Sequence, residues 1–287
     1  MVYFTCTRSV LGAIKDIFML LIAGRFKKKV INHLHGADFS QFYQRSGILK
    51  TLLKKAYQTV DTSIVLTKSM AAEFDHFPDM EKEVISNFCP SDFDQDIVKG
   101  ESLTVVFYSN LMKSKGILDF LEAARIIADL RPDIIFQIGG RYMGDHLMSA
   151  TQIKNRVEAF LTLNHSLNIE YKGEICPKDR FAFLSNSSIF VLPTYYPIEG
   201  FPLTILEAMR CGNVIITTDH NYLSDVISGK NGALIPPCDV AAIVQQLLRY
   251  LNDKKLLNQV QQYNVKEAKS NYTENRFLKD IKVILRV

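Results

Sequence analysis

Short apolar segments alternate with helical patterns along almost the whole chain, and this alternation restricts the fold more than any other feature. Most of the short segments are continuous apolar runs, which is typical of strands buried on both faces of a parallel sheet. The sequence therefore predicts an α/β fold built from doubly wound parallel sheets. The candidate strands are Val30–Leu34, Ser63–Leu66, Leu103–Tyr108, Ile134–Ile138, Ile169–Lys172, Ile189–Leu192 and Val214–Thr217.

Two segments between these strands repeat apolar residues with the period of a helix. The second of them follows Asp239, a residue suited to cap the start of a helix. Each helix is therefore expected to bury one face. The first face comprises Ile117, Phe120, Leu121, Ala124, Ile127 and Ala128, and the second comprises Val240, Ile243, Val244, Leu247, Leu248 and Leu251.

The best candidate for a domain boundary is Asn87–Glu101, which has no clear periodicity and several turn-forming residues. A length of 287 residues allows two domains of modest size. We expect a first domain over residues 1–95, a second over residues 96–273, and a C-terminal helix over residues 274–287. Whether that helix returns to the first domain stays open.

Charge is unevenly distributed between the first segments of the chain. Residues 1–60 contain ten Lys or Arg and two Asp, a balance of +8, whereas residues 61–100 contain three Lys and nine acidic residues, a balance of −6. A basic surface attracts phosphates, anionic lipid headgroups or nucleic acid, and a merely solvated face stays an alternative. The chain has no Trp and no basic–aromatic stripe, which argues against a nucleic-acid role.

Neither a membrane span nor a cysteine framework is predicted. The apolar run Ile17–Ala23 is far shorter than the ~20 residues that cross a bilayer. It fits either a helix packed on a sheet or an amphipathic helix lying on a membrane. The five cysteines are scattered, so neither a disulfide framework nor a zinc site is expected, and a cytoplasmic location fits best.

The segment Pro193–Gly212 carries the most chemical information. It follows a buried strand, places Pro202 in a position suited to a first helical turn, and ends at Gly212, a natural helix stop. The start of a helix at the carboxyl end of a strand favours a bound phosphate. Because Pro202 lacks an N–H group, the donors would be Gly200, Phe201 and Leu203.

Two carboxylates lie eight residues apart in this segment. Glu207, about two turns into the predicted helix, is placed to accept hydrogen bonds from two vicinal hydroxyls. Glu199 lies just before the helix N-terminus, close to where a sugar would lie. A carboxylate pair is also compatible with a hydrolase. A further alternative is that Glu199 complements the helix dipole while Glu207 is a solvated helix residue.

The stretch EGFPLTILEAMRCG, from Glu199 to Gly212, resembles glycosyltransferase family 4, whose retaining GT-B members carry two glutamates at this spacing in a very similar context. The resemblance implies a GT-B fold with two Rossmann-like domains. It also implies that Glu207 binds the nucleotide ribose and that Glu199 lies near the donor sugar at the reacting centre.

A second family feature is a donor loop, here SNLMKSKG from Ser109 to Gly116. By resemblance, Lys115 clamps the donor diphosphate, while Asn110 replaces the family arginine and Lys113 is the candidate to compensate. A cation at this point stabilises the leaving diphosphate, so neither a metal nor a cofactor is expected besides the nucleotide diphosphate sugar.

A third feature is a strand that ends in His35-Gly36. The family histidine at this position faces the donor sugar, so His35 is the third catalytic candidate beside Glu199 and Lys115, and His33 is expected to be structural. The resemblance runs from about Val30 to the end of the chain. Family members usually begin with further strands and a glycine-rich loop, so the first domain is expected to be incomplete.

These features predict a retaining transferase that moves a sugar from a nucleotide diphosphate sugar to a hydroxyl of a glycan acceptor in cell-surface polysaccharide synthesis. A lipid-linked acceptor suits the basic first domain, which implies peripheral contact with the inner face of the membrane. One alternative is a catalytically weak or inactive nucleotide-sugar-binding fragment that needs a partner. Another is an epimerase or related enzyme that acts without a sugar acceptor.

Overall fold

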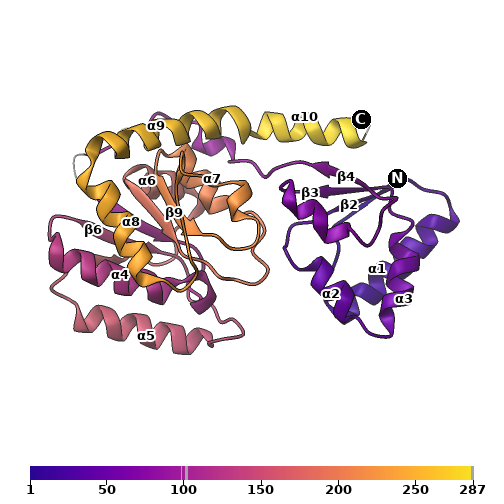
Figure 1. Cartoon of the computed structure of the whole chain (residues 1–287), viewed down its shortest axis with the longest axis horizontal. Coiled ribbons are helices and arrows are strands. Elements are labelled where there is room, and N and C mark those ends of the chain that lie inside the picture. Colours follow the sequence, from indigo (N-terminus) through magenta and orange to yellow (C-terminus); the bar gives the residue numbers. More distant parts are fainter. Residues whose placement is uncertain (98, 101–102, 286–287) are drawn as a thin grey trace. The chain divides into compact units, whose positions relative to one another are not determined.

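The computed structural model describes residues 1–97, 99–100 and 103–285 and divides the chain into two compact units. The first unit consists of Met1–Asn87 and Pro197–Phe201 together with the chain from Asp280 onward. The second unit consists of Phe88–Tyr196 and Pro202–Lys279 (Figure 1). Each unit has its own parallel sheet, which confirms the predicted α/β class.

The sheet of the first unit has four parallel strands in the order β1-β2-β3-β4. Both central strands, VINH and TSIV, are buried along their whole length, including their polar residues. The outer strand β4 has the polar sequence EKEV and is largely exposed. The strands are β1 (Val2–Phe4), β2 (Val30–His33), β3 (Thr62–Val65) and β4 (Glu81–Val84).

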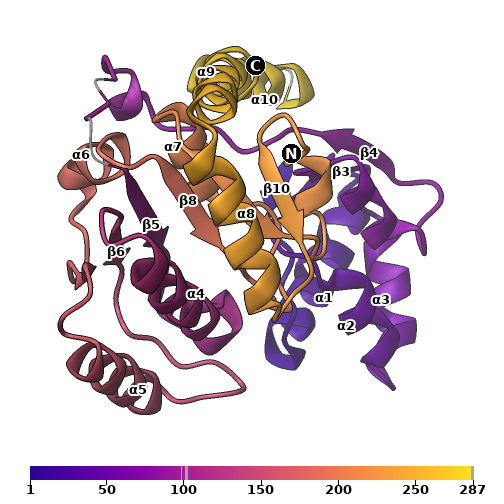
Figure 2. The ribbon, with the colours of Figure 1, turned by 60° about the vertical axis from the view of Figure 1, so that its left-hand side comes forward.

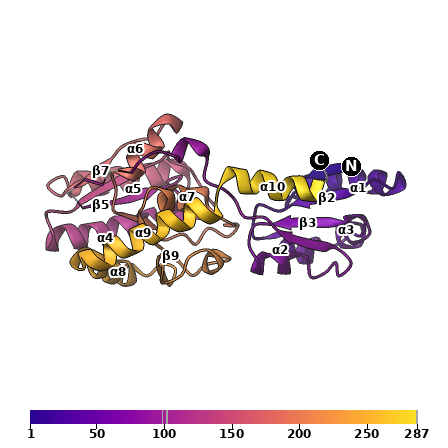
Figure 3. The ribbon, with the colours of Figure 1, turned by 90° about the horizontal axis from the view of Figure 1, so that it is seen from above.

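Three helices connect these strands: α1 (Val10–Arg25), α2 (Phe39–Arg45) and α3 (Leu49–Tyr57). The Ser9 hydroxyl caps α1 by accepting a hydrogen bond from the Gly12 N–H at 3.2 Å. Helices α1 and α3 pack against each other (Figure 3). Under α2 and α3 the rings of Phe39, Tyr57, Phe74 and Phe77 form an aromatic core.

The sheet of the second unit has six parallel strands in the order β10-β9-β8-β5-β6-β7. The chain moves outward from β5 through β6 to β7, then returns beside β5 at β8 and moves the other way. Ligands in such sheets bind at the carboxyl ends of the strands where the order reverses. The strands are β5 (Thr104–Tyr108), β6 (Ile135–Gly139), β7 (Ile169–Tyr171), β8 (Ile189–Leu192), β9 (Val214–Thr218) and β10 (Gly232–Ile235).

Helices cover this sheet, with α4 and α8 side by side across one face (Figure 2). All six residues of the predicted apolar face on α4 are buried, and Asp239 caps α8 by accepting from the Ala242 N–H at 2.9 Å. The helices are α4 (Ile117–Leu130), α5 (Ala150–Leu163), α6 (Arg180–Ser185), α7 (Leu203–Arg210), α8 (Val240–Asn252), α9 (Lys254–Asn271) and α10 (Glu274–Leu285). Short 3-10 turns are η1 (Ser69–Phe74), η2 (Ser91–Phe93), η3 (Lys113–Lys115), η4 (Pro177–Asp179) and η5 (Leu223–Asp225).

Two expectations from the sequence need correction. The strands β1, β4 and β10 were not predicted: β1 has only three residues, and β4 and β10 carry polar or small residues. Helix α7 begins at Leu203, with Pro202 as its extended N-terminal cap, so Glu207 lies little more than one turn into the helix. Among the described helices, none combines the length and the apolar content needed to cross a membrane.

Candidate active site

The loop after β5 packs against the segment that follows β8. The Ser114 carbonyl accepts hydrogen bonds from the Tyr195 N–H at 2.7 Å and from the Thr194 hydroxyl at 3.4 Å. Gly116 has a φ of +79°, and a Cβ atom there would lie 2.3 Å from the Pro193 carbonyl oxygen. Only glycine tolerates both conditions, so this residue holds the two motifs together.

The two lysines of this loop have different surroundings. The Lys115 ammonium lies 4.9 Å from the centroid of the Tyr196 ring, a favourable cation–π distance. Burial raises the pKa of Asp119, and the positive charge of Lys113 partly opposes this rise. Lys115 therefore contacts the segment after β8, and the Lys113 charge acts on Asp119 at the start of α4.

A cavity of about 220 Å³ lies at the carboxyl ends of β5 and β6. It contains the predicted residue Asn110 and also Arg141, a cation that the sequence did not single out. The backbone approaches closely here, because a Cβ atom on Gly140 would lie 1.8 Å from the Ser109 carbonyl oxygen. The lining residues are Tyr108, Ser109, Asn110, Gly140, Arg141, Glu174, Ile175 and Thr204.

Glu207 is buried on α7 and paired with Arg180, the first residue of α6. The Arg180 Nη1 atom lies 2.6 Å from Glu207 Oε1, whereas Glu207 Oε2 has no hydrogen-bond partner among the described residues. Burial raises the pKa of this carboxyl, and the Arg180 charge opposes the rise. A buried carboxylate with one unpaired oxygen is an acceptor that a ligand hydroxyl satisfies well.

Tyr108 links this ion pair to the cavity, because its side chain borders both. Burial raises the pKa of Tyr108 to about 12, the Glu207 charge adds to the rise, and Arg180 lowers it. Thr204, three residues before Glu207 on α7, lines the cavity as well. Arg180 and Glu207 do not line the cavity themselves, but both interact with Tyr108, which does. The burial of Glu207 is inconsistent with a solvated helix residue.

Four other predicted residues, Glu199, Gly200, Phe201 and His35, lie in the first unit. The Ala37 N–H donates to the Ile198 carbonyl at 3.4 Å, and the Asn87 side chain donates to the Phe201 carbonyl at 2.9 Å. A Cβ atom on Gly200 would lie 2.5 Å from the His35 carbonyl oxygen, so this contact requires glycine. The segment that carries the buried Glu199 thus packs on the loop that carries His35.

The rings of His33 and His35 lie one above the other, with centroids 4.1 Å apart and planes tilted by 31°. Burial lowers the pKa of His35, and the Arg8 charge lowers it further. Burial and the His35 charge lower the pKa of His33 to about 3. Both imidazoles are therefore neutral near pH 7, and His33 Nδ1 is 2.6 Å from the Tyr3 hydroxyl.

The structure divides the predicted site residues between the units. Glu199, Gly200, Phe201 and His35 belong to the first unit, and Asn110, Lys113, Lys115, Leu203 and Glu207 to the second. Sequence reasoning missed Arg180, Arg141 and Tyr108. Arg180 meets Glu207 across 27 positions of the chain, and neither its spacing nor its neighbours distinguish it from a surface arginine.

The family model for glycosyl transferases group 1 matches residues 90–267, which is more than half of the chain. This chain belongs to that family. The match covers the β5 loop, the cavity and the segment with the two glutamates, so the family expected from the motif is confirmed.

Curated relatives of this group 1 chain include the N,N'-diacetylbacillosaminyl-diphospho-undecaprenol alpha-1,3-N-acetylgalactosaminyltransferase of Campylobacter jejuni. It is 28% identical over 153 residues, covering 53% of this chain and 36% of the relative. The lipopolysaccharide core biosynthesis mannosyltransferase LpsB of Rhizobium meliloti is 28% identical over 153 residues, covering 52% of this chain and 42% of LpsB. The matched region is thus less than half the length of either relative.

Solved structures confirm the GT-B fold. Anabaena HepE in complex with UDP has a TM-score of 0.77 at 13% identity, covering 99% of this chain and 78% of HepE. Sucrose-phosphate synthase from Thermosynechococcus elongatus has a TM-score of 0.74 at 17% identity, covering 99% of this chain and 72% of that enzyme. These similarities concern the fold.

Proposed function

We propose that this chain is a retaining glycosyltransferase that moves a sugar from a nucleoside diphosphate sugar to a hydroxyl of a lipid-linked glycan acceptor in cell-surface polysaccharide synthesis. The observation that carries the proposal is the buried Glu207 carboxylate, which has one oxygen on Arg180 and the other without a partner among the described residues. Its neighbour Tyr108 lines a cavity at the carboxyl ends of β5 and β6, and β5 is one of the two strands between which the strand order reverses. The named activities of the Campylobacter and Rhizobium relatives support the reaction class.

In this proposal the second unit binds the nucleoside diphosphate. Glu207 accepts hydrogen bonds from the ribose hydroxyls, and Arg180 keeps the carboxylate oriented and ionised against the effect of burial. Lys115 stabilises the negative charge that develops on the leaving diphosphate as the bond to the sugar breaks. Asn110 and Arg141 line the cavity and contribute further donors. No metal or cofactor is assigned a role. The roles of Glu199 and His35 at the sugar remain predictions of the sequence.

The outer face of α1 supports a partner at the membrane surface. One side of this helix is buried on its own unit, yet large apolar side chains on the other side are exposed, including Leu11 at 82%, Phe18 at 65% and Phe26 at 67%. Arg25, Lys27 and other cations flank them. An apolar helix face bordered by basic residues fits the surface of an anionic bilayer. We propose that the chain is cytoplasmic and contacts the membrane through this face.

The first test is the binding of UDP and UDP-sugars to Glu207→Gln by calorimetry. Losing a charged acceptor is expected to weaken donor binding by roughly ten- to a hundredfold. Glu170→Gln is the matched control, because it removes a half-exposed carboxylate from β7, which pairs with Lys172 away from the cavity. Unchanged donor affinity in Glu207→Gln would refute the proposed donor site. Arg141→Gln serves as a second variant if Glu207→Gln fails to fold.

The second candidate function is nucleotide-sugar binding without catalysis. It is favoured by Asn110, which stands where the resemblance leads one to expect an arginine. A protein that binds donor and transfers no sugar to any lipid-linked acceptor would support this candidate. Measurable turnover would exclude it, and release of an epimerised or free sugar would instead point to an enzyme that works without an acceptor.

A further inference from the structure

A second and larger cavity, of about 660 Å³, lies at the opposite end of the sheet in the second unit. Its position is fixed by contacts of Lys99 and α9 with the chain just before β8: the Lys99 ammonium donates to the Ser187 carbonyl, and the Gln261 side chain donates to the Ser188 carbonyl at 3.2 Å. Gly212, shortly before β9, also lines it. The cavity thus lies near the amino ends of β8 and β9, whereas the proposed donor site lies at the carboxyl ends of β5 and β6.

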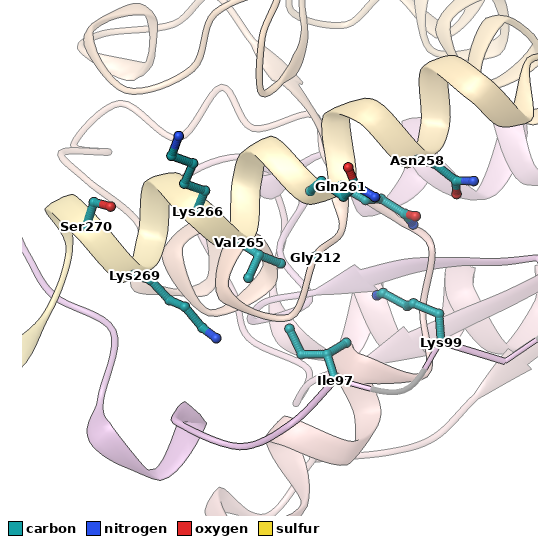
Figure 4. A pocket seen from close by; sticks show the side chains of 10 residues that line it. Ile97, Lys99, Gly212, Asn258, Gln261, Val265, Lys266, Lys269 and Ser270 are labelled. Atoms are coloured by element: carbon teal, nitrogen blue, oxygen red, sulfur yellow. The ribbon is translucent and has the colours of Figure 1, made fainter.

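The charged side chains among the described lining residues of this cavity are all basic. Three lysines, Lys99, Lys266 and Lys269, are among its described lining residues, and none of those residues is acidic. Lys99 and Lys269 direct their ammonium groups towards the space from opposite walls, whereas Lys266 points away from it (Figure 4). A space with two inward ammonium groups and no lining carboxylate favours an anion.

Lys99 is a buried cation that a bound anion would stabilise. Burial lowers its pKa to about 8, because a charged ammonium is poorly solvated there. An ammonium group has three donors, and the hydrogen bond to the Ser187 carbonyl uses one of them. An anion bound to Lys99 would satisfy the remaining donors and replace the lost solvation.

The rest of the lining suits a small organic molecule better than a bare ion. Asn258 and Gln261 contribute amide groups from α9, while Ile97 and Val265 contribute apolar surface on facing walls (Figure 4). The volume lies in the range of roughly 300–1,000 Å³ that is usual for small-molecule sites. Amides that bind hydroxyls, next to apolar surface that contacts a ring, match a phosphorylated sugar in size and chemistry.

We propose that this cavity binds a phosphorylated small molecule of sugar-phosphate size, with its phosphate between Lys99 and Lys269 and its hydroxyls on Asn258 and Gln261. This site is separate from the proposed donor site and does not depend on the proposed function. Occupancy would tie the segment before β5 to α9, because its two inward lysines come from these two parts of the chain.

Calorimetric titration of the whole chain with glucose 6-phosphate tests the proposal. Lys99→Gln and Lys269→Gln are each expected to weaken binding about tenfold or more, since each removes a charge-assisted hydrogen bond. Lys266→Gln should change the affinity less than about threefold, because this side chain points away. Lys255→Gln is the matched control, as it removes an exposed lysine of α9 that does not line the cavity.

Saturating UDP separates this site from the donor site. Binding of glucose 6-phosphate should be unchanged when UDP is present, and Glu207→Gln should bind it as the wild type does. Equal losses in Lys255→Gln and Lys269→Gln, competition by UDP, or no binding of glucose 6-phosphate at about 10 mM would each overturn the proposal. Vesicles containing phosphatidic acid form a separate arm: binding confined to them would show that the lysines meet a lipid headgroup, which contradicts a small-molecule site.

Discussion

At the scale of single residues, His33 is a buried base that the fold keeps neutral. Its pKa of about 3 lies below the usual value of 6.5, so the unfolded chain binds a proton that the folded chain excludes. The free energy of unfolding should therefore fall as the pH drops from about 6.5 towards 3, by at most ~1.4 kcal/mol per pH unit. Urea unfolding of the wild type and His33→Gln at about pH 7.5 and pH 5.5 measures this slope.

The expected result is a flatter pH dependence in His33→Gln, whatever its absolute stability. His146→Gln is the control, because it removes an exposed histidine. Identical slopes in all three proteins would show that His33 is protonated in the folded state, and the role of burial would then be wrong.

At this scale the sequence points to residues that lie in a recognisable motif and misses contacts between distant parts of the chain. Asn110, named from the donor loop, lines the cavity, and Glu207, named from the two-glutamate motif, pairs with Arg180. Their roles in binding stay predictions. Arg180 was missed because its partner is far along the chain. The close packing of Gly200 on the His35 carbonyl was not predicted either, because the two residues are far apart in the sequence and neither local pattern indicates the contact.

At the scale of elements, Gly116 joins the β5 loop to the segment after β8. Gly116→Ala should lower the free energy of unfolding by roughly 1–3 kcal/mol and weaken UDP binding, because the positive φ is strained and the new Cβ meets the Pro193 carbonyl. Gly173→Ala is the matched control: its φ of +75° is nearly the same, and nothing lies within 4 Å of the added Cβ. Equal effects of the two variants on UDP affinity would disprove a role for the close contact.

The exposed face of α1 makes a separate prediction at this scale. The double variant Phe18→Ser and Phe26→Ser should reduce flotation with vesicles of phosphatidylcholine and phosphatidylglycerol several-fold, since two large apolar side chains no longer enter the interface. Leu163→Ser on α5 is the control, because Leu163 is also 82% exposed. If the wild type binds equally well to vesicles of phosphatidylcholine alone, the basic residues do not contribute to binding. A shift from dimer to monomer in the double variant would show instead that a second copy covers this face.

Strands β2, β3, β5, β6, β7, β8 and β9 were located to within a residue or so. Most of them are largely apolar, whereas β3 (TSIV) and β7 (IEY) mix apolar and polar residues. Strand β1 has three residues, and β4 reads EKEV, so neither carries the pattern of a buried strand. Both exist because their backbones complete the hydrogen bonding of β2 and β3.

At the scale of the whole molecule, the two cavities of the second unit occupy opposite ends of one sheet, and this separation is testable by hydrogen exchange. UDP should protect the backbone after β5 and β6 and the first turn of α7, where Ser109, Gly140 and Thr204 line the smaller cavity. Glucose 6-phosphate should protect α9 around Gln261 and Lys269 instead. Because a bound ligand raises the free energy of local opening only where it touches, the two patterns should not overlap, and Glu207→Gln should erase only the UDP pattern. Protection of α9 by UDP would mean that the two ends of the sheet are coupled or that UDP occupies the lysine cavity, and either result would contradict two independent sites.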